Sequence, residues 1–296
     1  MGDNNDGQLG NGTYVTTNRP ERIVATNVTA IAAGYSHSLF LSNNGSLWAL
    51  GLGDNGQLGN GAGDNPNRPV QIVPSNVAAI AAGAGHSLFL KSDGSLWAMG
   101  DNAYGQLGDG TFNQTNLPEQ IVASNITAIA AGGFSSLFLS NSGSLWAMGD
   151  NYSGQLGNGT TNNVNLPEQI IASNVTATAA GATHTLFLKS DGSLWAMGCD
   201  VSGQLGDGNF TFIPPHFGVN YPEQIVVNPF YNQITGQLLG TGDVQLSFTG
   251  IAGNNYALDA ATSLAPPNWI PQATNTAGTY GALVFTNTPD PATNNF

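Results

Sequence analysis

A repeat with a constant period of 49 residues runs through most of this chain of 296 residues. The tripeptide Ser-Leu-Trp begins at Ser46, Ser95, Ser144 and Ser193. The tetrapeptide Gly-Gln-Leu-Gly begins at Gly7, Gly56, Gly105, Gly154 and Gly203, again in steps of 49. A fixed period of this size indicates a repeat architecture, in which each repeat is one supersecondary unit. Neighbouring repeats must then bury each other's apolar faces.

Each repeat predicts four short β-strands joined by turns. The first strand begins near residues 28, 77, 126 and 175, and the second covers 37–41, 86–90, 135–139 and 184–188. The third strand carries Ser-Leu-Trp, and the fourth follows a proline at 69–73, 118–122, 167–171 and 222–226, with an additional copy at 20–24. Asn-Gly or Asp-Gly, a strong hairpin signal, separates the second and third strands in three of the four copies.

Both faces of the predicted sheets are apolar. In the second strand Leu39 and Leu41 point to one side and Phe40 to the other, and the third strand alternates in the same way. Each sheet must therefore be covered on both sides, as the radially stacked sheets of a β-propeller are. The alanine-rich first strand suits the crowded position next to the axis. The proline-led fourth strand suits an outer edge, where a missing N–H costs least.

Over a whole repeat the sequence combines Ala-Ile-Ala-Ala-Gly, His-Ser-Leu-Phe-Leu, Asp-Gly-Ser-Leu-Trp-Ala-Met-Gly and Gly-Gln-Leu-Gly-Asn-Gly-Thr. This unit resembles the repeat of the regulator of chromosome condensation family, and the resemblance covers residues 2–226. Kelch repeats would need a Gly-Gly pair in phase, and WD repeats would need a Trp-Asp ending. The resemblance implies an all-β fold of the β-propeller type, which has seven blades in the eukaryotic founder of the family.

The number of repeats predicts an incomplete ring. Only four copies of the first three strands are present, so we expect residues 1–228 to form an open arc of about four blades. The additional fourth strand at 20–24 would belong to a preceding blade, and Met1 falls in phase with Met99, which suggests that the sequence starts inside a repeat of a longer protein. Uncovered terminal blades would expose apolar faces, so we expect self-association through them.

The period ends after Asn228, and residues 229–296 are expected to form a separate small module. Residues 237–250, 256–260 and 281–286 alternate as strands do, with Trp269 between the last two. This pattern is similar to a truncated fibronectin- or immunoglobulin-like β-sandwich, of a kind that often follows repeats in exported bacterial proteins. The tail is the basis for expecting an extracellular or cell-envelope location.

The charge balance argues against a nucleic-acid partner. The net charge is −13, from 18 acidic and five basic residues, and the basic residues do not cluster. Phosphate backbones are held by clustered Lys and Arg. No apolar run approaches the ~20 residues of a membrane-spanning helix, and no signal peptide is present in this stretch. The single cysteine, Cys199, excludes an internal disulfide and leaves the redox compartment open.

The repeated polar residues are expected to be structural, and no cofactor or metal is predicted. His37, His86 and His184 share one phase of the repeat but lie on separate blades, and Ser135 interrupts the series. A hydrogen bond in each blade is therefore favoured over a shared metal ion. The Asp- and Asn-rich loops lack the bidentate acid that closes a calcium loop. The repeated glutamines are predicted to bond between blades, and the repeated tryptophans to pack between them: Gln57, Gln106, Gln155, Gln204, Trp48, Trp97, Trp146 and Trp195.

The loops that differ between copies are the candidate binding residues. There is no Gly-x-Ser-x-Gly elbow, P-loop or His-Glu-x-x-His motif, so the chain is predicted not to be an enzyme. Loops on a rigid scaffold are where binding is usually found. Tyr35, Tyr104 and Phe134 are candidate contact residues in such loops, together with Phe212 and Phe217 of an apolar insertion in the last repeat.

The leading hypothesis is a non-catalytic repeat scaffold that binds another protein or a cell-surface component through its blade loops. The alternative is a glycan-binding or polysaccharide-active propeller domain of an exported bacterial protein. Acids and aromatic residues gathered at one mouth of the arc would favour that alternative. Guanine-nucleotide exchange is implied by the eukaryotic relative, but family membership does not transfer activity, and no exchange motif is matched.

Overall fold

The structure is a computed structural model that describes residues 1–207 and 218–225 and, beyond them, five strands. It divides the chain into two compact units, Met1–Ile225 and Val226–Phe296. Phe212, Phe217 and His216, all in the apolar insertion of the last repeat, lie outside the described residues.

The first unit contains four antiparallel sheets of four strands each, in which the strands follow the chain order. The first blade is β1 (Val28–Ala33), β2 (His37–Ser42), β3 (Leu47–Gly51) and β4 (Val70–Val73). The second is β5 (Val77–Ala82), β6 (His86–Lys91), β7 (Leu96–Gly100) and β8 (Thr115–Val122). The third is β9 (Ile126–Ala131), β10 (Ser135–Ser140), β11 (Leu145–Gly149) and β12 (Val164–Ile171). The fourth is β13 (Val175–Ala180), β14 (His184–Lys189), β15 (Leu194–Cys199) and β16 (Gly218–Ile225).

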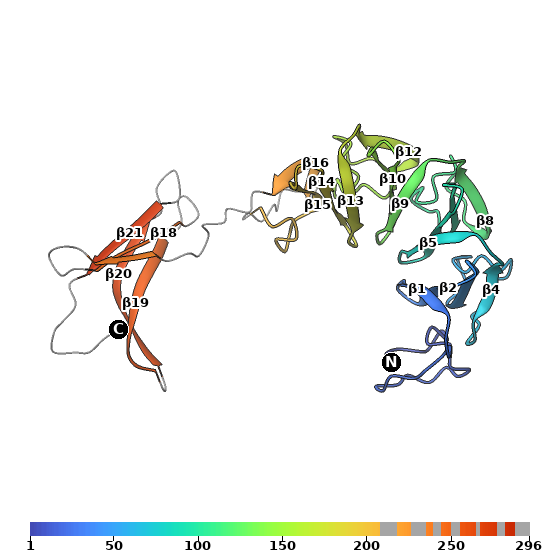
Figure 1. Ribbon diagram of the computed structural model, residues 1–296, viewed down its shortest axis with the longest axis horizontal. Coiled ribbons are helices and arrows are strands. Elements are labelled where there is room, and N and C mark those ends of the chain that lie inside the picture. The colour runs from blue at the N-terminus through green and yellow to red at the C-terminus, as the bar shows by residue number, and fades with distance from the viewer. Residues whose placement is uncertain are drawn as a thin grey trace. The chain divides into compact units, whose positions relative to one another are not determined.

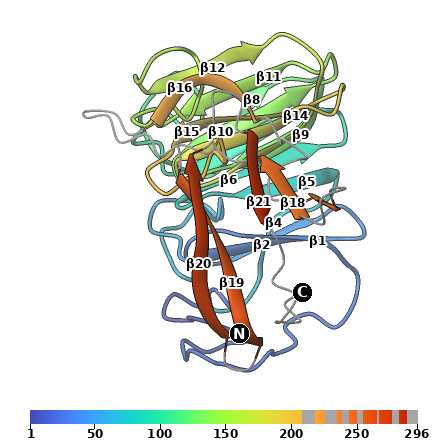
Figure 2. The same cartoon turned by 90° about the vertical axis from the view of Figure 1, so that its left-hand side faces the viewer.

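The four blades follow one another along an open arc (Figure 1). Their sheets lie one above another when the arc is viewed from the side (Figure 2). The first strands β1, β5, β9 and β13 contact one another in succession, and so form the inner side of the arc. An all-β, four-bladed incomplete propeller therefore confirms the expected fold class.

Each blade enters its first strand through a left-handed turn. The asparagine before that strand has a positive φ of 67–71° in all four copies: Asn27, Asn76, Asn125 and Asn174. Asparagine tolerates this region better than other residues with a Cβ. This turn therefore makes the inner strand begin at the same position of every repeat.

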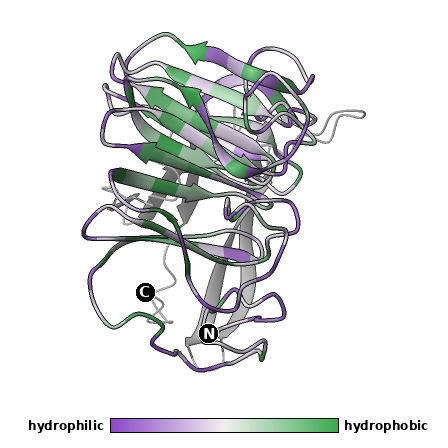
Figure 3. Cartoon of the chain, turned by 90° about the vertical axis from the view of Figure 1, so that its right-hand side faces the viewer, coloured by the Kyte–Doolittle hydropathy of each residue, from purple (hydrophilic) through white to green (hydrophobic). Residues whose placement is uncertain are grey.

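Three apolar clusters hold the arc together, one at each junction between blades. At the first junction Leu39 and Leu41 of β2 pack with Phe89 and Met99 of the second blade, and Leu58 of the Gly-Gln-Leu-Gly loop completes the cluster. The other two junctions repeat this arrangement. Hydrophobic colour accordingly gathers on the strands of the blades, and hydrophilic colour on many of the loops (Figure 3). Each blade therefore presents a leucine face to the blade that follows and an aromatic face to the blade that precedes.

The predicted fourth strand at 20–24 is not formed. In the second blade β8 pairs with β7 through four residue pairs, the last being Gly100↔Thr115. Near the N-terminus only the isolated bridge Gly2↔Thr17 is present, and it is the counterpart of that last pair. No strand that the structure describes lies beside residues 20–24, so this stretch has no ladder to join.

The fourth blade exposes the face that the other blades bury. Leu188 is 40% exposed, whereas its counterpart Leu139 in the third blade is 3% exposed. Ala177 and Ala179 of β13 are also exposed. At the opposite end of the arc Ile31 of β1 is 80% exposed, whereas its counterpart in the second blade is partly buried. Both ends of the arc thus expose apolar surface that lies at a junction in the middle blades.

The second unit contains five described strands in two sheets. They are β17 (Thr235–Leu238), β18 (Val244–Thr249), β19 (Asn255–Leu264), β20 (Pro267–Thr276) and β21 (Ala282–Asn287). The stretch 237–250, expected to alternate as a strand, contains the second half of β17 and all of β18, which pair antiparallel. Trp269, expected between strands, lies within β20, and its main chain is paired with Ala261 of β19. The fibronectin- or immunoglobulin-like character of this unit stays a prediction.

Candidate functional site

A buried hydrogen bond joins His37 and His86 each to the next blade. Nε2 of His37 lies 2.9 Å from Oγ of Ser87, and Nε2 of His86 lies 3.0 Å from Oγ of Ser136. Each serine also donates from Oγ to the main-chain carbonyl of a loop glutamine, Ser87 to Gln57 and Ser136 to Gln106, both at 2.7 Å. Because the serine proton is used in that bond, the imidazole Nε2–H must be the donor to the serine. These two histidines therefore lie at junctions between blades, not at an open site.

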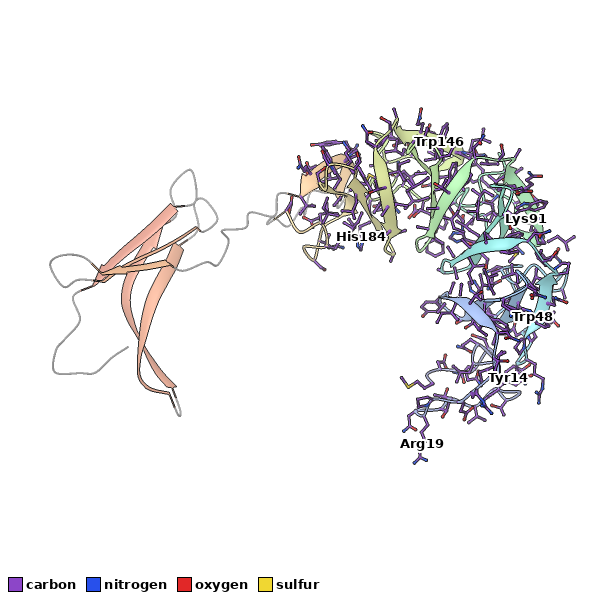
Figure 4. All side chains as sticks on the ribbon, viewed as in Figure 1. Tyr14, Arg19, Trp48, Lys91, Trp146 and His184 are labelled. Carbon is purple, nitrogen blue, oxygen red and sulfur yellow. The ribbon has the colours of Figure 1, made fainter. Side chains whose placement is uncertain are left out.

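Burial lowers the pKa of His37 and of His86 to about 4. Protonation would place a hydrogen on Nδ1, which is buried and has no hydrogen-bond partner in either ring. The ring of each histidine also packs against the glycine that ends its inner strand, where a Cβ would collide with the imidazole. His184 of the fourth blade is only half-buried and lies toward the inner side of the arc (Figure 4).

The glutamine side chains bond within their own loops. Nε2 of Gln106 donates to Asp101 at 2.9 Å, and Nε2 of Gln155 donates to Asp150 at 2.7 Å. Oε1 of each glutamine accepts the main-chain N–H two residues earlier, an arrangement shared by Gln57 and Gln204. The inter-blade contact is made instead by the glutamine main-chain carbonyl. The amide side chain is thus not the inter-blade group that the sequence predicts, because it is needed to hold its own loop.

The tryptophans lie on the aromatic faces of the blades. Each ring stacks on the phenylalanine of the neighbouring strand, with centroids 5.9 Å apart for Phe89 and Trp97 and 6.0 Å apart for Phe40 and Trp48. Each indole N–H donates to the serine two residues earlier, and Trp97, Trp146 and Trp195 pack against the cluster of the preceding junction. Lys91 lies with its Nζ 3.9 Å from the ring centroid of Trp97. Figure 4 shows Trp48, Trp146 and Lys91 toward the outer side of the arc.

Two of the candidate contact residues meet at the end of the blades that carries the Gly-Gln-Leu-Gly loops and the turns between first and second strands. We call this end the mouth of the arc. The rings of Tyr104 and Phe134 lie 5.1 Å apart at an interplanar angle of 44°. Tyr104 belongs to the Gly-Gln-Leu-Gly loop of the second blade and Phe134 to the β9–β10 turn of the third. They are 38% and 37% exposed, so each ring is available to a partner. This aromatic pair is assembled from adjacent blades and has no equivalent in the other described copies of the repeat.

An aspartate is bonded to the turn that carries Phe134. The main-chain N–H of Asp150 donates to the carbonyl of Phe134 at 2.8 Å. The Asp150 carboxylate accepts from Gln155 and from the N–H of Tyr152, so its position is fixed. Tyr152 is an exposed aromatic residue that the sequence reasoning misses. The sequence could have pointed to Tyr152, because this position differs in every copy of the repeat. Its counterparts are Asn5, Asp54, Ala103 and Val201.

Tyr35 does not join this group. It lies in the β1–β2 turn of the first blade and is 86% exposed. Its counterpart in the second blade, Ala84, donates its main-chain N–H to the carbonyl of Gly133 in the third blade. Tyr35 is therefore two blades away from Phe134 along the row of inner turns. Phe212 and Phe217 cannot be added to either location, since they lie outside the described residues.

Among the described residues no group of three or more His, Cys, Asp or Glu side chains is placed to hold a metal ion. No helix in the described ranges is long and apolar enough to cross a membrane.

Comparison with known proteins identifies the repeat. The RCC1-like domain matches residues 1–241 of the chain. The chain belongs to the RCC1-like domain family. A comparison with curated protein sequences gives no match.

Solved structures share the fold. The crystal structure of human WBSCR16 is 26% identical with a TM-score of 0.65, and the match covers 85% of this chain and 70% of that one. Prp20p from Saccharomyces cerevisiae is 25% identical with a TM-score of 0.58, covering 75% of this chain and 55% of that one. Yeast RCC1 (Prp20) bound to Kap60 is 22% identical with a TM-score of 0.59, covering 75% and 56%. The chain therefore spans about half the length of the yeast relative.

Proposed function

We propose that this RCC1-like arc is a non-catalytic scaffold that binds a protein partner through the mouth that carries Tyr104 and Phe134. The observation that carries the proposal is the contact between these two rings across adjacent blades. Partly exposed aromatic residues on a rigid support bury large areas at small entropic cost, and such residues dominate binding energy at interfaces. The structure of Prp20p was described with its binding to Gsp1p and histones, so a protein partner has precedent among relatives.

The surrounding charge favours a basic partner. The chain carries a net charge of −13, and Asp101 and Asp150 lie in the loops beside the aromatic pair. Complementary charge accelerates encounter and favours partners of opposite sign. Lys or Arg side chains of a partner would also stack favourably on the two aromatic rings.

The double variant Tyr104→Ala/Phe134→Ala tests the proposal. A photo-crosslinking residue at 104 would first identify the partner in the producing cells, and calorimetry would then give its Kd. We expect the double variant to bind about 30-fold more weakly, as for a pair of interface hot spots worth about 2 kcal/mol. Phe112→Ala, which removes an exposed ring from another loop, should leave the Kd unchanged. An unaltered Kd in the double variant would show that the partner binds at another surface of the protein.

Glycan binding is the second candidate, because aromatic rings beside fixed carboxylates also suit a sugar ring. A glycan array probed with the wild type and the same double variant separates the two. Binding of one glycan class that is lost in the double variant would assign this mouth to a saccharide. Guanine-nucleotide exchange is a weaker candidate, and a small-GTPase exchange assay would test it.

We also propose that the exposed leucine face of the fourth blade associates with the start of a second copy. In the middle junctions the inner-strand isoleucine, such as Ile80, packs beside two alanines of the preceding blade. Ala177 and Ala179 of the fourth blade and Ile31 of the first are exposed members of that same arrangement. Head-to-tail association of this kind is heterologous and can continue beyond a dimer.

Leu188→Asp should abolish this association. Sedimentation velocity over a range of protein concentrations should show the wild type growing in mass with concentration. The variant should stay monomeric, because a carboxylate would be desolvated at the contact. Leu166→Asp, at an exposed leucine of β12, should behave as the wild type does. A wild type that stays monomeric throughout the range contradicts the proposal.

A further inference from the structure

Residues 2–17 lie on the first blade where a loop of the preceding blade lies on each of the following blades. The main-chain N–H of Gly12 donates to the carbonyl of Asn67 at 2.8 Å. Oγ of Ser38 donates to the carbonyl of Gln8 at 2.9 Å. The counterparts of these bonds at the next junction are Gly61 to Asn116 at 2.9 Å and Ser87 to Gln57 at 2.7 Å. We call residues 2–17 the N-terminal segment.

The N-terminal segment approaches the first blade as closely as the loops at the other junctions do. Gly7 has a φ of +79°, and a Cβ added there would lie 2.7 Å from Cα of Asn67. Gly56 meets the second blade in the same way. The segment is covered less well on its other side, since Leu9 is half-buried whereas its counterpart Leu58 is fully buried. Contacts with the first blade therefore hold the segment in place.

The corresponding loop of the fourth blade, residues 200–206, is formed but has no following blade. Oδ1 of Asp200 accepts the N–H of Leu205 at 3.0 Å, a bond that an asparagine makes in three other copies. Gly203 has a φ of +74°. No described atom lies within 4 Å of the position that a Cβ on Gly206 would take. Its counterparts at 10, 59, 108 and 157 each meet a side chain of the blade that follows.

We propose that the N-terminal segment is autoinhibitory, because it occupies the position that residues 200–206 of a second copy take when its fourth blade associates with the first blade. This inference rests on the head-to-tail association proposed above. The incoming loop can reach Ser38 and Asn67 only after the segment has left them. The segment is tethered to the first blade through residues 18–27, so it competes at a high effective concentration. Association is weakened in proportion to the fraction of molecules in which the segment is bound.

Alanine at two equivalent glycines distinguishes the two competing loops. Gly7→Ala places a methyl group against the main chain of Asn67 when the N-terminal segment is bound. Gly203→Ala places the same methyl group on the loop of the incoming fourth blade. Both glycines have a positive φ, so both variants carry the same conformational cost. The full-length wild type and both variants would be compared by sedimentation velocity over one range of concentrations.

We expect opposite effects from the two substitutions. Gly7→Ala should associate at about tenfold lower concentration than the wild type, because the first blade is uncovered more often. Gly203→Ala should need about tenfold higher concentration, because the collision now opposes association itself. Increased association in both variants would indicate non-specific contacts of a loosened chain and would overturn the proposal.

Hydrogen exchange measured by mass spectrometry on the associated wild type gives an independent result. Peptides from residues 2–17 should lose protection on association, whereas peptides from 53–66, whose loop stays packed on the second blade, should keep theirs. A wild type that associates while 2–17 keep their protection overturns the autoinhibition and leaves the head-to-tail association standing. So does a Gly7→Ala variant that associates at the same concentration as the wild type. If neither the wild type nor Gly7→Ala associates, both proposals are wrong.

Discussion

Replacing Gly56 by alanine should destabilise the protein by about 3–4 kcal/mol, combining the strain of a left-handed residue with a backbone collision. Gly56 has a φ of +83°. An added Cβ would collide with the carbonyl oxygen of Thr115 and lie 2.6 Å from Cα of Asn116, both main-chain atoms of β8 in the following blade. Main-chain atoms of a strand cannot relieve the collision by rotating, as a flexible side chain can. The two blades must therefore move apart at this junction. Urea unfolding followed by tryptophan fluorescence would measure the loss.

Gly192→Ala isolates the conformational part of that effect. Gly192 has a φ of +82°, and no described atom lies within 4 Å of the position of its Cβ. This variant should lose only about 1–2 kcal/mol, the cost of the left-handed conformation alone. Equal losses in the two variants would show that the close approach of the blades contributes nothing. That result would contradict the packing described at the first junction.

Acid should unfold the arc between pH 6.5 and pH 4. His37 and His86 have a pKa of about 4 in the folded state because they are buried, against 6.5 as the ordinary value. The unfolded chain therefore binds more protons in this range. The stability that depends on the two neutral histidines is fully present above pH 6.5 and is lost as the pH falls toward 4. Each histidine lowers the free energy of unfolding by about 1.4 kcal/mol for each unit by which the pH falls, or by about 3 kcal/mol over the interval. The free energy of unfolding, measured at half-unit steps of pH, should follow this slope.

His86→Ser should halve that slope. The third blade supplies the precedent, since Ser135 occupies the same position there and is buried. His184→Ser serves as the control, because it should keep the acid-dependent loss that His37 and His86 contribute. NMR titration of the imidazole Cε1 protons gives an independent reading. A slope that His86→Ser leaves intact would mean that other groups cause the acid response.

The 49-residue period predicts the fold because each copy must satisfy the same contacts. The inner, second and third strands lie where the pattern places them. The outer strand extends further in three copies. β8, for instance, begins at Thr115 rather than at the proline, because Gly100 of the neighbouring strand pairs with it. The stretch 20–24 has the residue pattern of this strand but no partner, and a strand cannot form on pattern alone.

The candidate site was less accessible to sequence reasoning. Tyr104 and Phe134 are 30 residues apart and belong to different repeats, so only the stacking of the blades brings their rings together. The role of the glutamines depended on which atom reaches the next blade, and a sequence does not distinguish an amide from a carbonyl.

The hydrogen bond between His37 and Ser87 joins residues 50 positions apart, and so does the bond between His86 and Ser136. The first two junctions are therefore interchangeable. If residues 77–125 were deleted, Asn76 would precede Ile126 as Asn125 now does, and His37 would face Ser136. Recombination between these two copies of the repeat can thus shorten the arc by one whole blade and keep the same histidine–serine contact. The number of blades can therefore change through duplication or deletion of a repeat, while the hydrogen bond at such a junction is kept.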